Sequence, residues 1–341
     1  MFNKFGRLAL AAGLTVFVLP AASWADPADA GNHNPITASI AWMQTAAEYK
    51  ALCHQTYNTA RLVIDEKVRT GAYVKVGDKL CEETFYTLDD GKAVRFYRPL
   101  AIVLDIDETV LDNSGAEAWL IRNNVSHNDE NWDAWCRYQG SHPEICREVP
   151  GASDFLRYCM EIGVTPIYLT DRSESVREPT LKTLEALGLG CPDLNEHLIL
   201  QDRKRDIANA KKMLADMGMS ESSDLGRYML NNYSGKAGRR MSVLKTYKVL
   251  GWFGDNMYDM PVEVSKDLKE PAEILKARDK EIEDHKNDLG ATFFILPNAT
   301  YGSWLNRKTV SPDDMVKFIS DYGFGEWYKA HKAELHGGST R

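Results

Sequence analysis

Short apolar runs alternate with longer amphipathic stretches from about residue 98 onward. Five of the runs are short enough for buried strands, namely residues 101–104, 166–169, 198–200, 249–253 and 292–296. Four stretches around them are expected to be helical, at residues 152–162, 175–188, 205–217 and 239–247. This alternation predicts an α/β fold built on a doubly wound, mostly parallel sheet with helices on both faces.

A long helix is predicted ahead of the sheet. Apolar and aromatic side chains recur every three or four residues from Trp42 to Ile64, which marks one face of an α-helix. We therefore expect residues 37–97 to form an N-terminal helical segment packed on a main domain at residues 98–330. That segment and an insertion at about residues 115–150, after the first core strand, would form a small helical subdomain.

Three further stretches have biased compositions. Residues 26–36 and 331–341 are polar and rich in small residues or proline, so we expect a flexible mature N-terminus and a loose tail. Residues 266–288 carry many charges of both signs, with Pro271 at a helix start, which predicts a solvated helix without chemistry.

Residues 1–25 have the pattern of a cleaved secretory signal. Lys4 and Arg7 precede an apolar run from Leu8 to Leu19, and small residues flank Trp24 before a cleavage site. A membrane anchor is the alternative, but a spanning helix needs about 20 apolar residues. No cysteine lies near the cleavage point, so no lipid attachment is expected. The chain is predicted to be periplasmic or secreted, with no membrane span.

Composition and charge argue against some classes of binding partner. The 341 residues include 41 Lys and Arg against 49 Asp and Glu, a net charge of -8, which argues against binding a nucleic-acid polymer. Six cysteines permit disulfides in an oxidising compartment, and Cys136 with Cys146 is the favoured local pair. Cys53 and Cys159 fall on apolar helical stripes, where core thiols are expected. Without a CxxC pair, a structural zinc site is not expected.

Polar residues follow three of the predicted strands at their carboxyl ends, where ligands of open α/β sheets collect. Asp105 and Asp107 follow the first strand, Thr170 follows the second, and Asp255 follows the fourth. Lys236 lies between glycines, upstream of Asp255. Oxygen ligands with no His or Cys nearby favour Mg²⁺, held between Asp105 and Asp255. One carboxylate could then attack phosphorus while the other handles the leaving-group proton.

Each of these residues, taken alone, also fits a role outside phosphoryl transfer. The D-x-D-x-T pattern could open a calcium loop, but such a loop needs glycine at its sixth position, where Val110 stands. Thr170 alone could cap a helix, Lys236 alone could lie on a surface turn, and Asp255 alone could start an Asx turn. Their joint occurrence in this order, with Asp105, Thr170 and Asp255 each after a predicted strand, favours a phosphoryl-transfer site.

The motifs resemble those of the haloacid dehalogenase superfamily of phosphotransferases. The match is closer still to the class C acid phosphatases, the lipoprotein-e family of 5′-nucleotidases. It rests on VLDIDETVLDNS, PGASDFLRY, YLTDR, GKAGRR, GDNMYDM and LPNATYGSW, at residues 103–114, 150–158, 168–172, 235–240, 254–260 and 296–304. The chain departs from the family in lacking the lipoprotein cysteine, in Gly115 and Ala116 after Ser114, and in Asp171 where Asn is common.

The resemblance implies a role for each matching residue. Asp105 would be the nucleophile that forms an aspartyl-phosphate, and Asp107 the general acid and then the base that activates water. Thr170 and Lys236 would bind phosphoryl oxygens. Mg²⁺ would be held by Asp105, Asp255 and the backbone carbonyl of Asp107, and Asp259 would support that site from outside the ligand set.

The expected function is Mg²⁺-dependent hydrolysis of nucleoside 5′-monophosphates. Trp132 and Tyr301 would stack on the base, as similar aromatics do in the resembling family, although either ring could instead anchor its own loop. A broad-specificity acid phosphatase is the alternative among enzymes. A non-enzymatic binding or storage protein on the same fold is the other rival, and the presence of both Asp105 and Asp107 counts against it. Family members often pair as homodimers, but no seam for this is visible in the sequence.

Overall fold

The computed structural model describes residues 36–262, 270–303 and 329–330. The expected signal at 1–25, the tail at 331–341 and all but the last residue of 26–36 lie outside the described residues. The helices are α1 (Ile36–Thr45), α2 (Ala47–Thr70), α3 (Ser114–Arg122), α4 (Asp129–Ser141), α5 (Ala152–Glu161), α6 (Arg177–Ala186), α7 (Leu194–His197), α8 (Arg203–Asp216), α9 (Asp224–Tyr233), α10 (Lys236–Thr246) and α11 (Pro271–His285). The strands are β1 (Tyr73–Val76), β2 (Lys79–Thr87), β3 (Ala93–Leu104), β4 (Thr165–Ser173), β5 (Leu198–Gln201), β6 (Lys248–Gly254) and β7 (Phe293–Ile295).

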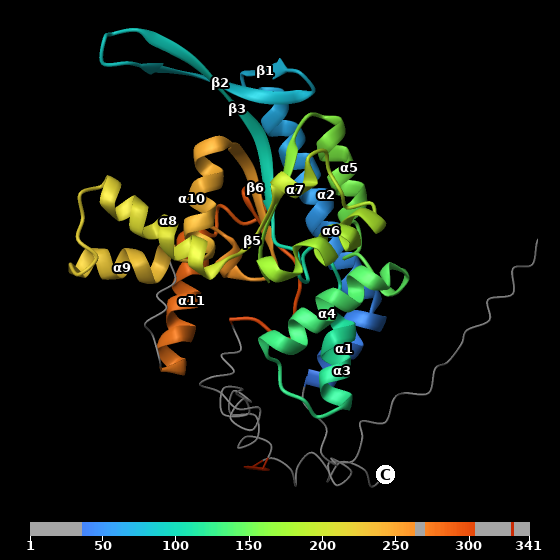
Figure 1. Cartoon of the computed structure of the whole chain (residues 1–341). Coiled ribbons are helices and arrows are strands. Elements are labelled where there is room, and N and C mark those ends of the chain that lie inside the picture. The colour runs from blue at the N-terminus through green and yellow to red at the C-terminus, as the bar shows by residue number, and fades with distance from the viewer. Residues whose placement is uncertain (1–35, 263–269, 304–328, 331–341) are drawn as a thin grey trace, which may run out of the picture. The chain divides into compact units, whose positions relative to one another are not determined.

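The sheet is parallel where the predicted strands lie. Its central strand, β3, pairs in parallel with β4 on one side and with β6 on the other, and β5 and β7 extend the two sides. The carboxyl ends of β3, β4 and β6 therefore meet at one edge (Figure 1). The predicted α/β fold is confirmed, and all five predicted core strands are present.

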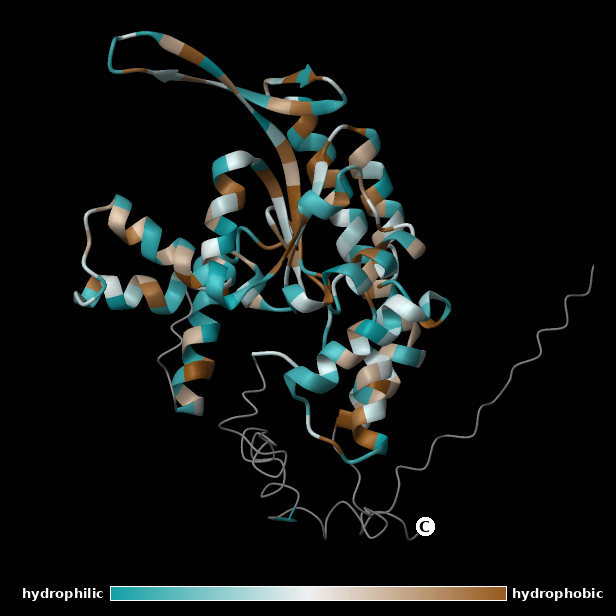
Figure 2. Ribbon diagram, in the orientation of Figure 1, coloured by the Kyte–Doolittle hydropathy of each residue, from teal (hydrophilic) through white to brown (hydrophobic). Residues whose placement is uncertain are grey.

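Helices cover both faces of the parallel strands. Side chains on one face of β3, such as Ile102 and Leu104, pack in a core with α2 and α5. Val103 on the other face packs in a second core that includes Val243 of α10 and Trp252 of β6. Figure 2 shows these strands as a band of hydrophobic residues between more hydrophilic helices. The two cores therefore pack against both faces of the sheet beneath its polar edge.

The expected helical segment at residues 37–97 is wrong beyond Thr70. Residues after α2 form strands, and β1, β2 and the first part of β3 make an antiparallel ribbon. β-branched and aromatic residues dominate the paired segments at residues 84–87 and 94–97, which favours strands over helix. Figure 1 shows this ribbon extending away from the parallel strands.

The insertion after β3 is helical, as expected. It contains α3 and α4, and Gln44 of α1 donates a hydrogen bond to Ser114 at the start of α3 (3.1 Å). The predicted pairing of Cys136 with Cys146 is not present, because all six cysteines, each within the described residues, are free thiols. The Cys146 thiol instead donates to the backbone oxygens of Gln139 and His142. Among the described helices, none has the length and apolar character needed to cross a membrane.

Candidate active site

A tight turn at the end of β3 presents the first two aspartates. The N–H of Asp105 still donates to Phe253 of β6 (2.9 Å), which prolongs the sheet ladder by one residue. The N–H groups of Val110 and Leu111 then both donate to the oxygen of Ile106, and Glu108 has a φ of 52°. The chain thus leaves the extended form directly after Asp105.

The loop after β6 brings in two more carboxylates. Asp255 follows Gly254 directly, and Asp259 ends a single helical turn at Met257–Asp259. The carboxylate of Asp259 accepts a hydrogen bond from the N–H of Asn256 (3.0 Å), which fixes the side chain within the loop. A Cβ on Gly254 would lie 2.3 Å from Asp259, so only glycine permits this close approach.

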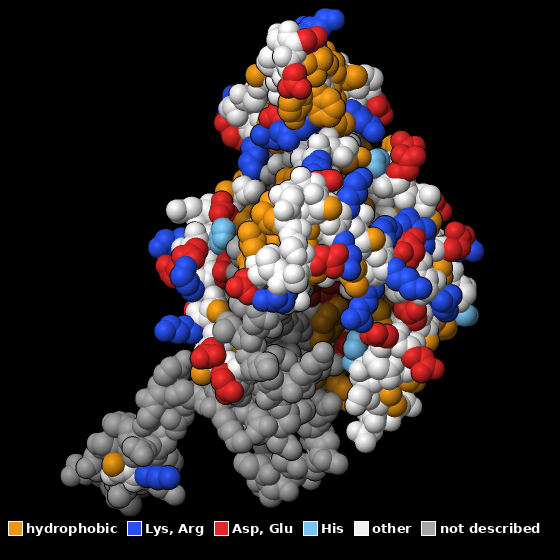
Figure 3. Space-filling model, turned by 60° about the vertical axis from the view of Figure 1, so that its left-hand side comes forward, with side chains coloured by type: hydrophobic (Ala, Val, Ile, Leu, Met, Phe, Trp, Pro, Cys, Tyr) orange, Lys and Arg blue, Asp and Glu red, His pale blue; other side chains and the backbone are white. Residues whose placement is uncertain are grey.

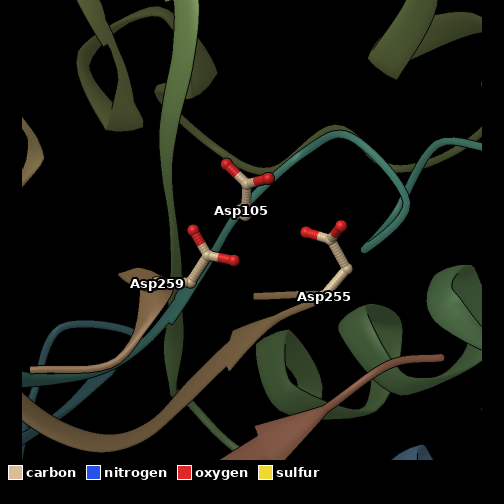
Figure 4. Close-up of side chains that lie close together, drawn as sticks. All are labelled: Asp105, Asp255 and Asp259. Atoms are coloured by element: carbon tan, nitrogen blue, oxygen red, sulfur yellow. The ribbon is translucent and has the colours of Figure 1, made fainter. Parts of the chain in front are cut away.

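Three carboxylates and one ammonium form the centre of the site. One oxygen from each of Asp105, Asp255 and Asp259 lies within 4.8 Å of the others, and Figure 4 shows the three side chains turned toward a shared space. Lys236, the first residue of α10, donates to Asp105 (2.7 Å) and to Asp259 (2.5 Å). Burial would lower the pKa of Lys236, but the two carboxylates raise it.

Burial and mutual repulsion disfavour the charged forms of the carboxylates in this cluster. Burial raises the pKa of Asp105, and repulsion from Asp259, Asp107 and Asp255 adds to that effect while Lys236 opposes it. Burial together with Asp259 raises the pKa of Asp255 to about 8, although a hydrogen bond from Asn298 acts in the opposite direction. A site that penalises its own negative charge in this way is typical of catalytic centres.

The end of β4 supplies Thr170, which is fully buried. Its hydroxyl oxygen accepts a hydrogen bond from the N–H of Arg172 (3.1 Å), so the hydroxyl proton is left to be donated. The neighbouring Asp171 forms an ion pair with Arg239 of α10. This ion pair gives the acidic residue at position 171 a structural role beside the site.

Two contacts in the site were not predicted from the sequence. Arg172 donates to the carboxylate of Asp107 through Nη2 (2.8 Å) and Nε (3.0 Å). Asn298, in the loop after β7, donates to Asp255 (2.7 Å). Arg172 lies near the carboxyl end of β4 and Asn298 lies just after β7, at the same sheet edge, and this position is the signal that could have identified them.

The two candidate stacking residues lie together. Trp132 of α4 and Tyr301 of the loop after β7 are 169 positions apart, yet their ring centroids are 6.5 Å apart in an edge-to-face arrangement. The His127 ring also packs against Trp132, with ring centroids 5.5 Å apart. The two predicted rings therefore form one aromatic pair.

Comparison with known proteins now identifies the family. The sequence model described as "HAD superfamily, subfamily IIIB (Acid phosphatase)" matches residues 22–304. The chain belongs to this family of acid phosphatases. The resemblance inferred from the motifs is thus confirmed, and the protein is a phosphomonoesterase of the haloacid dehalogenase superfamily.

Solved structures agree with this assignment. The class C acid phosphatase from Bacillus anthracis is similar at 26% identity and a TM-score of 0.57, over 90% of this chain and 97% of that one. Its structure with tungstate bound is similar at 27% identity and a TM-score of 0.56, over 90% and 98% of the two chains. Phosphatases of this superfamily generally use a divalent metal, and the three-carboxylate cluster is the acidic group that fits one.

Proposed function

We propose that this acid phosphatase hydrolyses nucleoside 5′-monophosphates through an aspartyl-phosphate on Asp105, with Mg²⁺ as its metal. The observation that carries the proposal is the meeting of Asp105, Asp255, Asp259 and Lys236 at the carboxyl ends of β3 and β6. Phosphoryl transfer consists mostly of positioning and charge neutralisation, and this group supplies both.

The residues present fit a divalent cation. Three carboxylates against one ammonium leave two negative charges, and burial together with repulsion between the carboxylates raises the pKa values of Asp105 and Asp255. Hard oxygen donors favour Mg²⁺, which Asp105, Asp255 and the backbone carbonyl of Asp107 would hold. Asp259 supports the site by holding Lys236 beside it. When bound, the metal neutralises Asp105 and accepts a phosphoryl oxygen.

Each side chain of the site has its own role in the proposed reaction. Asp105 attacks phosphorus, and Asp107 donates a proton to the leaving oxygen and later removes one from water. The hydroxyl of Thr170 can donate to a phosphoryl oxygen, because the N–H of Arg172 uses a lone pair of its oxygen and leaves its proton available. Lys236 has three N–H donors, of which two bind Asp105 and Asp259, so the third can also bind the phosphoryl group.

Phosphate release from the mature protein, with and without a chelator, tests this function. Chelation should abolish turnover, and Mg²⁺ should restore it. Full activity after chelation would refute the metal, and no activity under any condition would favour a binding or storage protein on this fold.

The Trp132–Tyr301 pair supports a nucleotide substrate. A base stacked on aromatic rings gains roughly 1–3 kcal/mol. Trp132→Ala or Tyr301→Ala should therefore lower kcat/KM for a nucleoside monophosphate by about tenfold or more, and much less for a small aryl phosphate. Equal losses on both substrates would favour the broad-specificity acid phosphatase.

The proposed location is the periplasm or the exterior, after cleavage at residue 25. The basic and apolar pattern of residues 1–25 supports it. N-terminal sequencing of the exported protein should read from Asp26. A mature chain that retains Met1 would contradict this proposal.

We also propose a homodimer, formed through the β2–β3 ribbon. Tyr86, Val94 and Phe96 lie on one face of the ribbon and are 57%, 44% and 40% exposed. Figure 3 shows hydrophobic side chains gathered there, at the top of the view. A lone two-stranded ribbon is marginally stable in water, so this face is expected to be covered. The charged residues of this face, Glu82 and Arg98, pair with each other, so its exposed apolar part is matched by a second copy of itself.

Light scattering at micromolar concentration tests the dimer. Phe96→Lys should give a monomer, whereas Phe85→Lys, on the opposite face of the same ribbon, should leave the dimer intact. A monomeric wild-type protein would refute the proposal.

A further inference from the structure

Four side chains form a closed ring of hydrogen bonds around Asp107. Arg172 donates to Asp107 Oδ1 and also, through Nη2, to Gln139 Oε1 (2.9 Å). Gln139 Nε2 donates to Asn113 Oδ1 (3.0 Å), and Asn113 Nδ2 donates to Asp107 Oδ1 (2.8 Å). Arg172, Gln139 and Asn113 are each fully buried, so the ring is closed to solvent except at Asp107.

The two carboxylate oxygens of Asp107 accept different numbers of hydrogen bonds within this ring. Oδ1 accepts from Arg172 Nη2 (2.8 Å), from Arg172 Nε (3.0 Å) and from Asn113 Nδ2 (2.8 Å). Within the part of the chain that the structure describes, Oδ2 has a single, longer hydrogen bond, from Arg172 Nε (3.3 Å). Rotation of the carboxylate would break three hydrogen bonds inside a buried network, so its orientation is fixed.

The insertion contributes directly to the ring. Trp135 and Gln139 lie four residues apart on α4 and therefore share one face of that helix. The indole N–H of Trp135 also donates to Asn113 Oδ1 (2.8 Å). A Cβ on Gly115 would lie 3.1 Å from the Trp135 ring, so the glycine leaves room for the indole. The helix that carries Trp132 thus also supports Asp107.

We propose that Arg172, with Gln139 and Asn113, positions Asp107 for proton transfer to the leaving group. This rests on the proposed function, in which Asp107 is the general acid. As the bond from Asp105 to phosphorus forms, the bond from phosphorus to the leaving oxygen breaks, and that oxygen takes the proton of Asp107. Water then attacks the phosphoryl group, Asp107 takes a proton from it, and Asp105 leaves as a carboxylate.

Leaving-group dependence separates this role from a structural one. An alkyl oxygen is a poor leaving group and needs the proton, whereas an acidic phenol leaves without it. The parameter kcat/KM reports the steps up to phosphorylation of Asp105, so the later role of Asp107 as base does not affect it. Arg172→Met should lower kcat/KM for an alkyl phosphate at least tenfold more than for an aryl phosphate with an acidic phenol.

Gln139→Met tests the same ring without removing a charge, and should show the same selectivity to a smaller degree. It keeps the proposal testable if Arg172→Met fails to fold. Arg172→Lys keeps the charge but loses the paired geometry, so it should recover only part of the alkyl phosphate activity. Arg240→Met is the matched control, because Arg240 is also buried but donates to the carbonyl of Tyr258 (2.6 Å). Its effect on the two substrates should be equal.

Asp107→Asn provides the reference for selectivity. If it is selective for the aryl phosphate and both Arg172→Met and Gln139→Met are not, the positioning role is overturned while the general acid stands. If Asp107→Asn itself shows no selectivity, the general-acid assignment fails instead.

Discussion

Gly254→Ala perturbs the carboxylate cluster without removing any of its charges. The added Cβ would lie 2.3 Å from Cβ and from Oδ2 of Asp259, far closer than such atoms pack. Asp259 cannot easily retreat, because it accepts from the N–H of Asn256 and pairs with Lys236. Overpacking of this kind costs about 1–3 kcal/mol. If Asp259 is displaced from the position that metal binding needs, metal affinity should fall by about tenfold for each 1.4 kcal/mol required to restore that position.

Calorimetric titration with Mg²⁺ measures this effect, and thermal unfolding of the metal-free protein shows whether the fold absorbs the strain instead. Gly190→Ala is the matched control, since its Cβ would have no neighbour closer than 3.7 Å and metal affinity should not change. A Gly254→Ala protein with wild-type Mg²⁺ affinity and an unchanged melting temperature would refute the reasoning.

Three further predictions concern single side chains. Tyr57→Phe removes a buried hydrogen bond to the carbonyl of Thr109 (2.6 Å), so denaturant unfolding should show a loss of about 1–3 kcal/mol, and kcat should fall as the turn loosens. Tyr168→Phe, which breaks a comparable buried bond to Leu189, should affect stability alone; equal kcat losses would contradict this. Lys236→Met leaves Asp105 and Asp259 without their ammonium, and kcat should drop about a hundredfold or more, whereas a tenfold loss or less would count against its role. Burial, aided by Lys79, lowers the pKa of His197 below 6.5, so the unfolded chain binds the proton first; unfolding free energy should decline as pH falls below 6.5, and His197→Gln should remove that part of the decline.

The parallel sheet and the polar ends of its strands could be predicted because their signals are local. Buried parallel strands are continuous apolar runs, and the residue after each run falls at the same sheet edge. Asp105, Thr170 and Asp255 follow from that rule alone. Lys236 begins α10, and only the order of motifs along the chain suggested that it would reach Asp105, 131 positions away.

Other parts of the site depend on contacts that a single sequence does not encode locally. Arg172 and Gln139 are polar, so their types suggest exposure, yet both are buried because each satisfies the other. Their partners Asp107 and Asn113 lie in another segment of the chain. The β2–β3 ribbon has a weaker strand pattern in the sequence, because charged residues interrupt its apolar positions.

The central claim is that Asp105 becomes phosphorylated, and trapping of that adduct tests it most directly. Asp107→Asn should still form the adduct from an aryl phosphate with an acidic phenol, which needs no proton, but should hydrolyse it slowly for lack of a base. Acid quenching followed by borohydride, which reduces an acyl phosphate, and peptide mass spectrometry would locate the modified residue. We predict that Asp105 is reduced to homoserine in substrate-treated protein and not in the untreated control. Modification of a different residue, or no adduct in a variant that still turns over, would contradict the account.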